Sequence, residues 1–323
     1  MVSLQTRLML LVGAMFAIIY AVIVMIGTAS GFNDFYFYLM LSLGMMWFQY
    51  MIGPKMIEWT MGIKYLTKEQ NPKLFSMVEE MCRRGNIPMP RLCISSHQAP
   101  NAFAFGRGIN DGRVCVSQGI LNLLNEEELR AVLGHELTHI KNRDVLFITM
   151  LSVIPMIMYR IAWSFMFSGR RNDRNSGNTM MIGVAALLFY FITNLLVLYG
   201  SRIREYYADK GAVELGNKPS SLASALYKLV YGSAKMANTA DMKEVEGMKA
   251  FFINDPSQAR NEIKELKELD MDKSGTIDGN ELFLLRNKTI NVSQGEKIME
   301  LMSTHPNMLK RIKHLSELAP VHA

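Results

Sequence analysis

Long uncharged stretches constrain this chain more than any other feature of its sequence. Residues 8–27 and residues 35–53 contain no charged side chain, and each stretch can cross about 30 Å of hydrocarbon as a helix. Two further apolar blocks, residues 145–167 and residues 180–200, flank a short polar linker. Arg160 interrupts the first of these blocks, at a cost of roughly 3 kcal/mol or more unless it faces protein or water. We therefore predict two transmembrane helical hairpins.

Polar segments with regular periodicity separate the apolar blocks. Residues 71–86 predict an amphipathic helix, and Asn125 with Glu128 predicts a capping-box start for a second helix. Three short β-like runs between them, bounded by turn-forming residues, predict a small antiparallel sheet: residues 91–96, 102–107 and 113–118. We expect an α+β membrane protein with a mainly helical domain that contains this sheet.

The formal net charge of +6 is compatible with either a nucleic acid or a membrane as partner. No basic patch is interleaved with aromatic residues, so we expect no nucleic-acid binding. Basic residues such as Lys55, Arg202 and Arg204 lie beside apolar blocks instead, which is expected at an anionic lipid bilayer surface. The three cysteines have no paired or metal-type spacing, which indicates buried free thiols in a reducing compartment. They are Cys82, Cys93 and Cys115.

The sequence GHELTH at residues 134–139 indicates a metal site. On a helix His135 and His139 lie one turn apart, so both imidazoles can reach one Zn²⁺ while Glu136 faces a water at the open position. A catalytic zinc needs a third protein ligand, and the helical sequence SRIREYYADKGA supplies Glu205 as a candidate. Asp209 lies one turn further on the same helical face, where it can accept a hydrogen bond from a ligating histidine.

Membrane topology provides an independent test of this ligand set. The two helices must present their ligands on one side of the membrane, so an even number of spans must separate His139 from Glu205. The predicted hairpin at residues 145–200 provides two spans. The topology is therefore consistent with a site that combines both helices.

These motifs resemble the HtpX family of membrane zinc metalloproteases, which are related to membrane proteases that process prenylated C-termini. The resemblance covers nearly all of the chain except about residues 250–300. Four segments carry it: PNAFAFG (100–106), LNEEELRAVLGHELTHIKNRD (124–144), SRIREYYADKGAVELG (201–216) and STHPNMLKRIKHL (303–315).

The resemblance implies that zinc is held by His135, His139 and Glu205 and that Glu136 is the general base. It also implies an edge strand on which an extended substrate adds as a further strand. That strand contains Asn101, Ala102, Phe103, Ala104 and Phe105.

A further donor is expected to stabilise the developing oxyanion. His305, in the family's HP element, is favoured as that donor or as a displaceable additional zinc ligand. Arg311, Tyr206 and Tyr207 are the other candidates, and the sequence does not rank them.

The sequence DMDKSGTIDGNE at residues 270–281 departs from the usual family pattern. It matches a calcium-binding EF-hand loop, with Gly275 at the position of the sharp turn, and an acidic solvated loop is the alternative. The loop lies in a predicted insert at about residues 256–290. Its predicted Ca²⁺ ligands are Asp270, Asp272, Ser274, the carbonyl of Thr276, Asp278 and Glu281.

The distribution of Lys and Arg predicts the orientation in the cell membrane. Arg7 precedes the first span, the loop between the first two spans has no Lys or Arg, and Lys55, Lys64 and Lys68 follow the second. This asymmetry places the catalytic domain in the cytoplasm, although the basic linker of the second hairpin argues the other way. The predicted organisation is an N-terminal hairpin (1–65), a first catalytic part (66–144), a second hairpin (145–200) and a second catalytic part (201–323).

The sequence thus predicts a multi-pass zinc endopeptidase that hydrolyses unfolded or damaged membrane proteins, modulated by calcium. A protease that processes prenylated proteins is one alternative. The other is a calcium-responsive membrane scaffold whose zinc is structural, and Glu136 argues against it because a structural site needs no base. The oligomeric state stays open.

Overall fold

The structure is a computed structural model, and it describes most of the chain from residue 61 onward. The predicted hairpin at residues 1–65 and the block at residues 145–167 lie largely outside the described residues. The described residues are 44, 47, 48, 50–55, 57–59, 61–95, 98–144, 147, 155, 158, 159, 161, 162, 176–236, 263, 266–288, 290 and 294–320.

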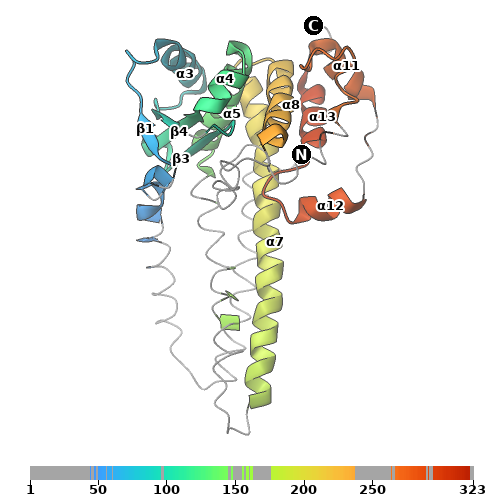
Figure 1. Cartoon of the computed structure of the whole chain (residues 1–323). Coiled ribbons are helices and arrows are strands. Elements are labelled where there is room, and N and C mark those ends of the chain that lie inside the picture. Colours follow the sequence, from blue (N-terminus) through green and yellow to red (C-terminus); the bar gives the residue numbers. More distant parts are fainter. Residues whose placement is uncertain are drawn as a thin grey trace. The chain divides into compact units, whose positions relative to one another are not determined.

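The chain divides into two compact units. The first comprises residues 1–52 and 146–201, and the second comprises residues 53–145 and 202–323. The boundary falls inside α7 (Ser176–Glu214), the long helix in Figure 1. Among the described residues α7 is the one helix long and apolar enough to cross a membrane, over Met180–Glu214 with a mean hydropathy of 2.3. One candidate span is therefore described, whereas the two predicted hairpins are not established.

A four-stranded sheet forms one side of the second unit. Its strands are β1 (Ile63–Tyr65), β2 (Arg91–Ser95), β3 (Ala102–Gly106) and β4 (Gly112–Ser117), in the order β1-β2-β4-β3. The pairs β1–β2 and β3–β4 are antiparallel, but β2 and β4 are parallel.

The prediction of an antiparallel sheet was therefore wrong for the central pair. The β3–β4 hairpin, closed by the short 3₁₀ helix η1 (Ile109–Asp111), joins the sheet through its second strand. This arrangement leaves β3 at the edge and makes β4 parallel to β2.

Local sequence explains where the helices of the second unit begin. The side chain of Asn71 accepts a hydrogen bond from the Leu74 amide and caps α3 (Pro72–Gly85). The predicted capping box at the start of α5 (Glu126–Lys141) is confirmed, with Asn125 and Glu128 bonded reciprocally. The other helices are α4 (Gln118–Leu123), α8 (Pro219–Met236), α11 (Gly279–Asn287), α12 (Gln294–Leu301) and α13 (Met308–Leu318).

A large hydrophobic core joins most of these elements. α5 packs against α8, α3 and β3, while α13 packs against α8 and α11 (Figure 1). Leu266, Ile277 and Leu282, on both sides of the acidic loop, belong to the same core as Leu133 of α5. The loop at residues 270–281 is therefore built into the second unit. The three cysteines are buried, which confirms that part of the prediction.

Candidate metal centre

Two helices supply the candidate metal ligands. α5 carries His135, Glu136 and His139, and α7 carries Glu205 within its part of the second unit. His135, Glu136 and Glu205 are buried, with exposed fractions of 1%, 3% and 6%. The environment of these polar groups is therefore largely free of water, so contacts inside the protein decide their orientation.

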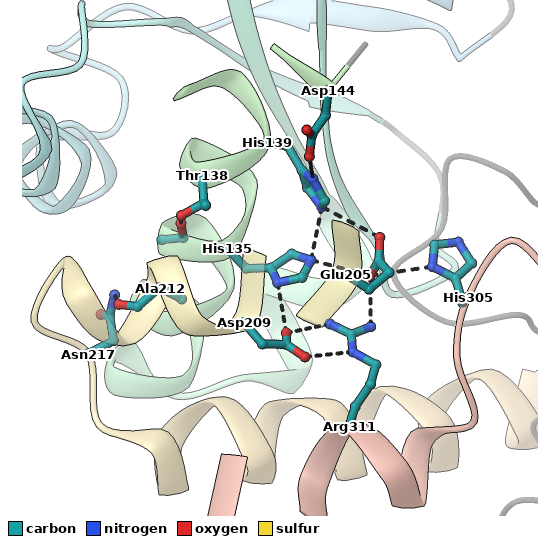
Figure 2. A network of polar contacts seen from close by, with 11 residues as sticks. His135, Thr138, His139, Asp144, Glu205, Asp209, Ala212, Asn217, His305 and Arg311 are labelled. Carbon is teal, nitrogen blue, oxygen red and sulfur yellow. Dashed lines mark hydrogen bonds and ion pairs between the residues drawn. The ribbon is translucent and has the colours of Figure 1, made fainter. Parts of the chain in front are cut away.

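The ligand atoms converge on one point, as Figure 2 shows. Nε2 of His135 and Nε2 of His139 lie 3.1 Å apart. The carboxylate of Glu205 lies 3.5 Å from the first of these nitrogens and 3.6 Å from the second. Ligands bonded at about 2.0–2.1 Å in a tetrahedron are roughly 3.3 Å apart. The three side chains therefore fit one Zn²⁺ and leave a fourth position for water.

The outer ring nitrogens are held by two further carboxylates. Nδ1 of His139 forms a 2.6 Å hydrogen bond with Asp144, and Nδ1 of His135 lies 2.9 Å from Asp209. A proton fixed on Nδ1 leaves the Nε2 lone pair of each ring for a metal. The two carboxylates thus favour, for each histidine, the tautomer that zinc binding requires.

An arginine lies behind each of these carboxylates. Arg311 of α13 donates to Asp209 at 3.0 and 2.7 Å, and Nε of Arg204 lies 3.0 Å from Asp144. The sequence interpretation missed both Asp144 and Arg204. The position of Asp144, five residues after His139 and at the end of α5, was the available signal. Arg204 was expected at the lipid surface, but it is 7% exposed and faces Asp144 instead.

The buried carboxylates make the pocket favourable for positive charge. Burial by itself lowers the pKa of His135, but the contacts with Asp209 and Glu205 outweigh it and raise the pKa to about 10. Burial also raises the pKa of Glu136, against the opposing effect of the two histidines. A carboxylate whose pKa is raised by burial is a better proton acceptor than an exposed one, as general-base catalysis requires.

The four candidate oxyanion donors lie in different surroundings. Nδ1 of His305 lies 3.5 Å from Glu205, and its buried Nε2 has no hydrogen-bond partner among the described residues. Arg311 is fully buried, and besides Asp209 it contacts Glu205 at 3.0 Å. Tyr206 packs edge-on against the ring of His314, while Tyr207 lies about 200° around α7 from Glu205. The geometry thus brings His305 and Arg311 to the site.

The edge strand β3 lies beside the base. The amide of Ser117 donates to the carbonyl of Asn101, and this bond sets the alternation of the β3–β4 ladder. By that alternation Ala102 and Ala104 direct their amide and carbonyl groups away from β4, toward the open edge. The amide of Ala104 hydrogen-bonds to Glu136.

The acidic loop brings three carboxylates together. One oxygen from each of Asp270, Asp272 and Glu281 lies within 4.8 Å of the other two. The hydroxyl of Tyr227, on α8, donates to Asp270 at 2.9 Å. Loop amides also bind the carboxylates, as the 2.7 Å bond from Met271 to Glu281 shows.

Two histidines and a glutamate around one point, with a buried glutamate in H-E-x-x-H position, define a zinc-dependent peptidase site. Residues 68–319 match peptidase family M48. Over 228 residues the chain is 49% identical to the protease HtpX homolog of Methanothermobacter thermautotrophicus, covering 71% of this chain and 86% of that protein. The chain therefore belongs to peptidase family M48, as a membrane zinc metalloprotease of the HtpX type.

A second relative and a solved structure are also similar to this chain. The chain is 33% identical over 280 residues to the protease HtpX homolog of Aquifex aeolicus, which covers 84% of this chain and 79% of that protein. The crystal structure of S. mikatae Ste24p matches with a TM-score of 0.51 and 17% identity, over 93% of this chain and 62% of that one. At this identity the likeness shows a shared fold alone.

Proposed function

We propose that the chain is an endopeptidase that cleaves unfolded or damaged membrane proteins, with zinc held by His135, His139 and Glu205. The observation that carries this proposal is the convergence of three ligand atoms 3.1–3.6 Å apart. The carboxylates behind both histidines support it, because structures that hold imidazoles in this way orient them for metal. A structural zinc would not need the buried Glu136.

The residues around the site have separate chemical tasks. When bound, zinc supplies a water of lowered pKa and polarises the scissile carbonyl. Glu136 takes the proton of that water and delivers it to the leaving amine. His305, whose Nε2 is buried, donates a hydrogen bond to the developing oxyanion. Arg311 orients Glu205 and Asp209 and takes no part in oxyanion binding, because both carboxylates already bind its guanidinium.

The edge of β3 receives the substrate as an added strand. The outward backbone groups of Ala102 and the position of Ala104 beside Glu136 support this assignment, because an extended peptide paired there passes the base. Main-chain pairing of this kind selects for an extended conformation rather than a particular sequence. It therefore suits substrates that are unfolded.

The protein is proposed to cross the cell membrane several times with its catalytic unit in the cytoplasm. The apolar part of α7 and the distribution of basic residues around the first two apolar stretches support this arrangement. Substrates leaving the bilayer on the cytoplasmic side would then reach the site directly.

Cleavage of an unfolded model protein by the purified full chain tests the proposal. Glu136→Gln should retain one zinc per chain and lose cleavage, because the substitution removes the base and leaves the three ligands intact. Glu214→Gln, an exposed carboxylate on α7, is the matched control. A zinc-loaded Glu136→Gln variant that cleaves as fast as wild type would refute the assignment. Cleavage confined to prenylated peptides would favour the processing protease instead.

We also propose that the loop at residues 270–281 binds Ca²⁺ and changes activity. The three carboxylates within 4.8 Å support binding, and the bond from Tyr227 of α8 links the loop to a helix packed on α5. Calcium should bind the wild-type chain and change its cleavage rate, and Asp270→Ala should abolish both effects. Calcium binding that persists in Asp270→Ala, or a flat titration of wild type, contradicts the proposal.

A further inference from the structure

Three large apolar side chains are exposed together at the end of α12. Met299, Leu301 and Met302 have exposed fractions of 41%, 52% and 61%. We call them the α12 edge. Clustered apolar side chains of this size usually mark a contact with a protein or a membrane, since burying each one is favourable by about 1.5–3 kcal/mol.

The side of α12 that carries Glu300 is fixed to the second unit. Glu300 forms an ion pair with Lys310 of α13 and accepts a hydrogen bond from the Asn307 amide at 3.3 Å. These contacts prevent α12 from rotating its apolar side chains inward. The outward direction of the α12 edge is therefore part of the fold.

Arg202 of α7 fixes the end of α12. Its Nη1 donates to the carbonyls of Glu300 at 2.8 Å, Leu301 at 3.2 Å and Ser303 at 2.8 Å. Carbonyls at the end of a helix lack partners within the helix. A buried arginine that binds two of them and the carbonyl of Ser303 beyond the helix therefore holds the chain firmly. The loop held in this way leads directly to His305.

The position of Arg202 in the sequence indicates what covers the α12 edge. Arg202 follows Gly200, the last residue of the apolar stretch of α7, by two positions, which is about 3 Å along a helix. Residues just beyond a membrane span lie at the headgroup layer. Because Arg202 binds carbonyls at the end of α12, that end of the helix lies within reach of the same layer. Helices that lie in the interface insert their apolar side about 5–10 Å into the boundary of headgroups and acyl chains.

We propose that the α12 edge inserts into the interfacial layer of the phospholipid bilayer and thereby positions the loop that carries His305. Exposed Lys297, two residues before Met299, adds attraction to anionic lipid. The inference of a lipid contact depends only on the geometry of α12 and Arg202. Its effect on cleavage rests on the proposed function.

The test uses the full chain in lipid nanodiscs, with a polarity-sensitive fluorophore on Met302→Cys. Labelling is selective because Cys82, Cys93 and Cys115 are buried. Met271→Cys is the matched control, since Met271 is 60% exposed and lies on the acidic loop. Nitroxide-bearing phospholipid should quench most of the emission at position 302 and little at position 271.

Two results would overturn the proposal. One is equal quenching by lipid at both positions, or none at position 302. The other is protection of position 302 from an aqueous quencher without quenching by lipid, which would assign the α12 edge to a protein partner or a second copy of the chain. Leu301→Cys repeats the measurement at an adjacent position and should give the same result.

A second measurement separates this proposal from the function of the site. Met302→Glu should lower the cleavage rate in nanodiscs several-fold without loss of bound zinc. Met89→Glu, at an exposed residue between α3 and β2, should leave the rate unchanged. If the wild-type protein cleaves no substrate, the quenching result still shows whether the α12 edge contacts lipid. If Met302→Glu cleaves as fast as wild type while position 302 is quenched, the positioning of His305 by the lipid contact is refuted.

Discussion

Gly211 of α7 lies so close to Thr138 of α5 that a Cβ built on the glycine would fall 2.2 Å from Cγ2 of the threonine. Thr138 precedes the candidate ligand His139, and Gly211 follows Asp209 by two residues. The contact therefore sets the distance between the two helices that carry the candidate metal ligands. No side chain larger than hydrogen fits between them without moving one of the helices.

Gly211→Ala should therefore separate α5 from α7, lower zinc affinity and destabilise the fold by about 1–3 kcal/mol. Thr138→Ala removes Cγ2 and should be tolerated better. The double variant should recover part of the lost affinity, with a coupling energy of about 0.5–3 kcal/mol. Competition with a chelator measures zinc affinity, and additive losses in the double variant would show that this contact does not set the spacing.

Asp144→Asn should weaken zinc binding by about 10–100-fold. The carboxylate holds the proton on Nδ1 of His139 at 2.6 Å, and an amide does this less well and leaves Arg204 without its anionic partner. Chelator competition again gives the affinity, with Glu214→Gln as the control. Unchanged affinity in Asp144→Asn would mean that the ring of His139 is oriented by its packing alone.

Arg311→Met should destabilise the zinc-free protein by about 3–5 kcal/mol, because it leaves the buried carboxylates of Glu205 and Asp209 without a balancing charge. The loss should be smaller in the zinc-loaded protein, since the metal supplies positive charge at the same place. Melting temperatures with zinc and with chelator test this difference. Arg84→Met, which affects an exposed pair with Glu80, should shift both melting temperatures equally.

The pKa of Asp111 predicts how the stability of the fold depends on pH. Burial raises its pKa, but hydrogen bonds from Arg107 and Arg113 outweigh burial and lower the pKa below the ordinary value of 3.8. A lowered pKa in the folded state stabilises the protein above pH 3.8, and this stabilisation is lost as the pH falls through the folded value. Asp111→Asn should therefore be less stable by about 1 kcal/mol at pH 6, with the difference shrinking below pH 3.8. Denaturant unfolding at both pH values measures it, and a constant difference would contradict the assignment.

Local sequence was enough to predict elements whose signals lie within a few residues. The capping box of Asn125 and Glu128 involves groups three positions apart, so its geometry follows from the helix itself. The spacing of His135 and His139 is of the same kind. The family match of residues 68–319 confirms the protease that this motif indicated.

The parallel pairing of β2 with β4 could not be predicted, because adjacent strands and turns indicate a hairpin but not which of its strands joins the rest of the sheet. Only the tertiary structure decided that question: β4 pairs with β2, while both strands of the hairpin contact α5.

At the metal centre, too, local sequence predicted some features and the tertiary structure decided others. The sequence by itself predicted which helices carry the candidate ligands: H-E-x-x-H is a local pattern with a fixed face, and the family resemblance implied Glu205. Only the tertiary structure decided that Asp144 and Arg204 meet, that Arg311 joins Glu205 to Asp209, and that Arg202 turns inward to bind the end of α12. The charge pattern by itself places Arg202 and Arg204 at a lipid surface. Burial in one core, where an unpaired charge is costly, gives each of them its partner.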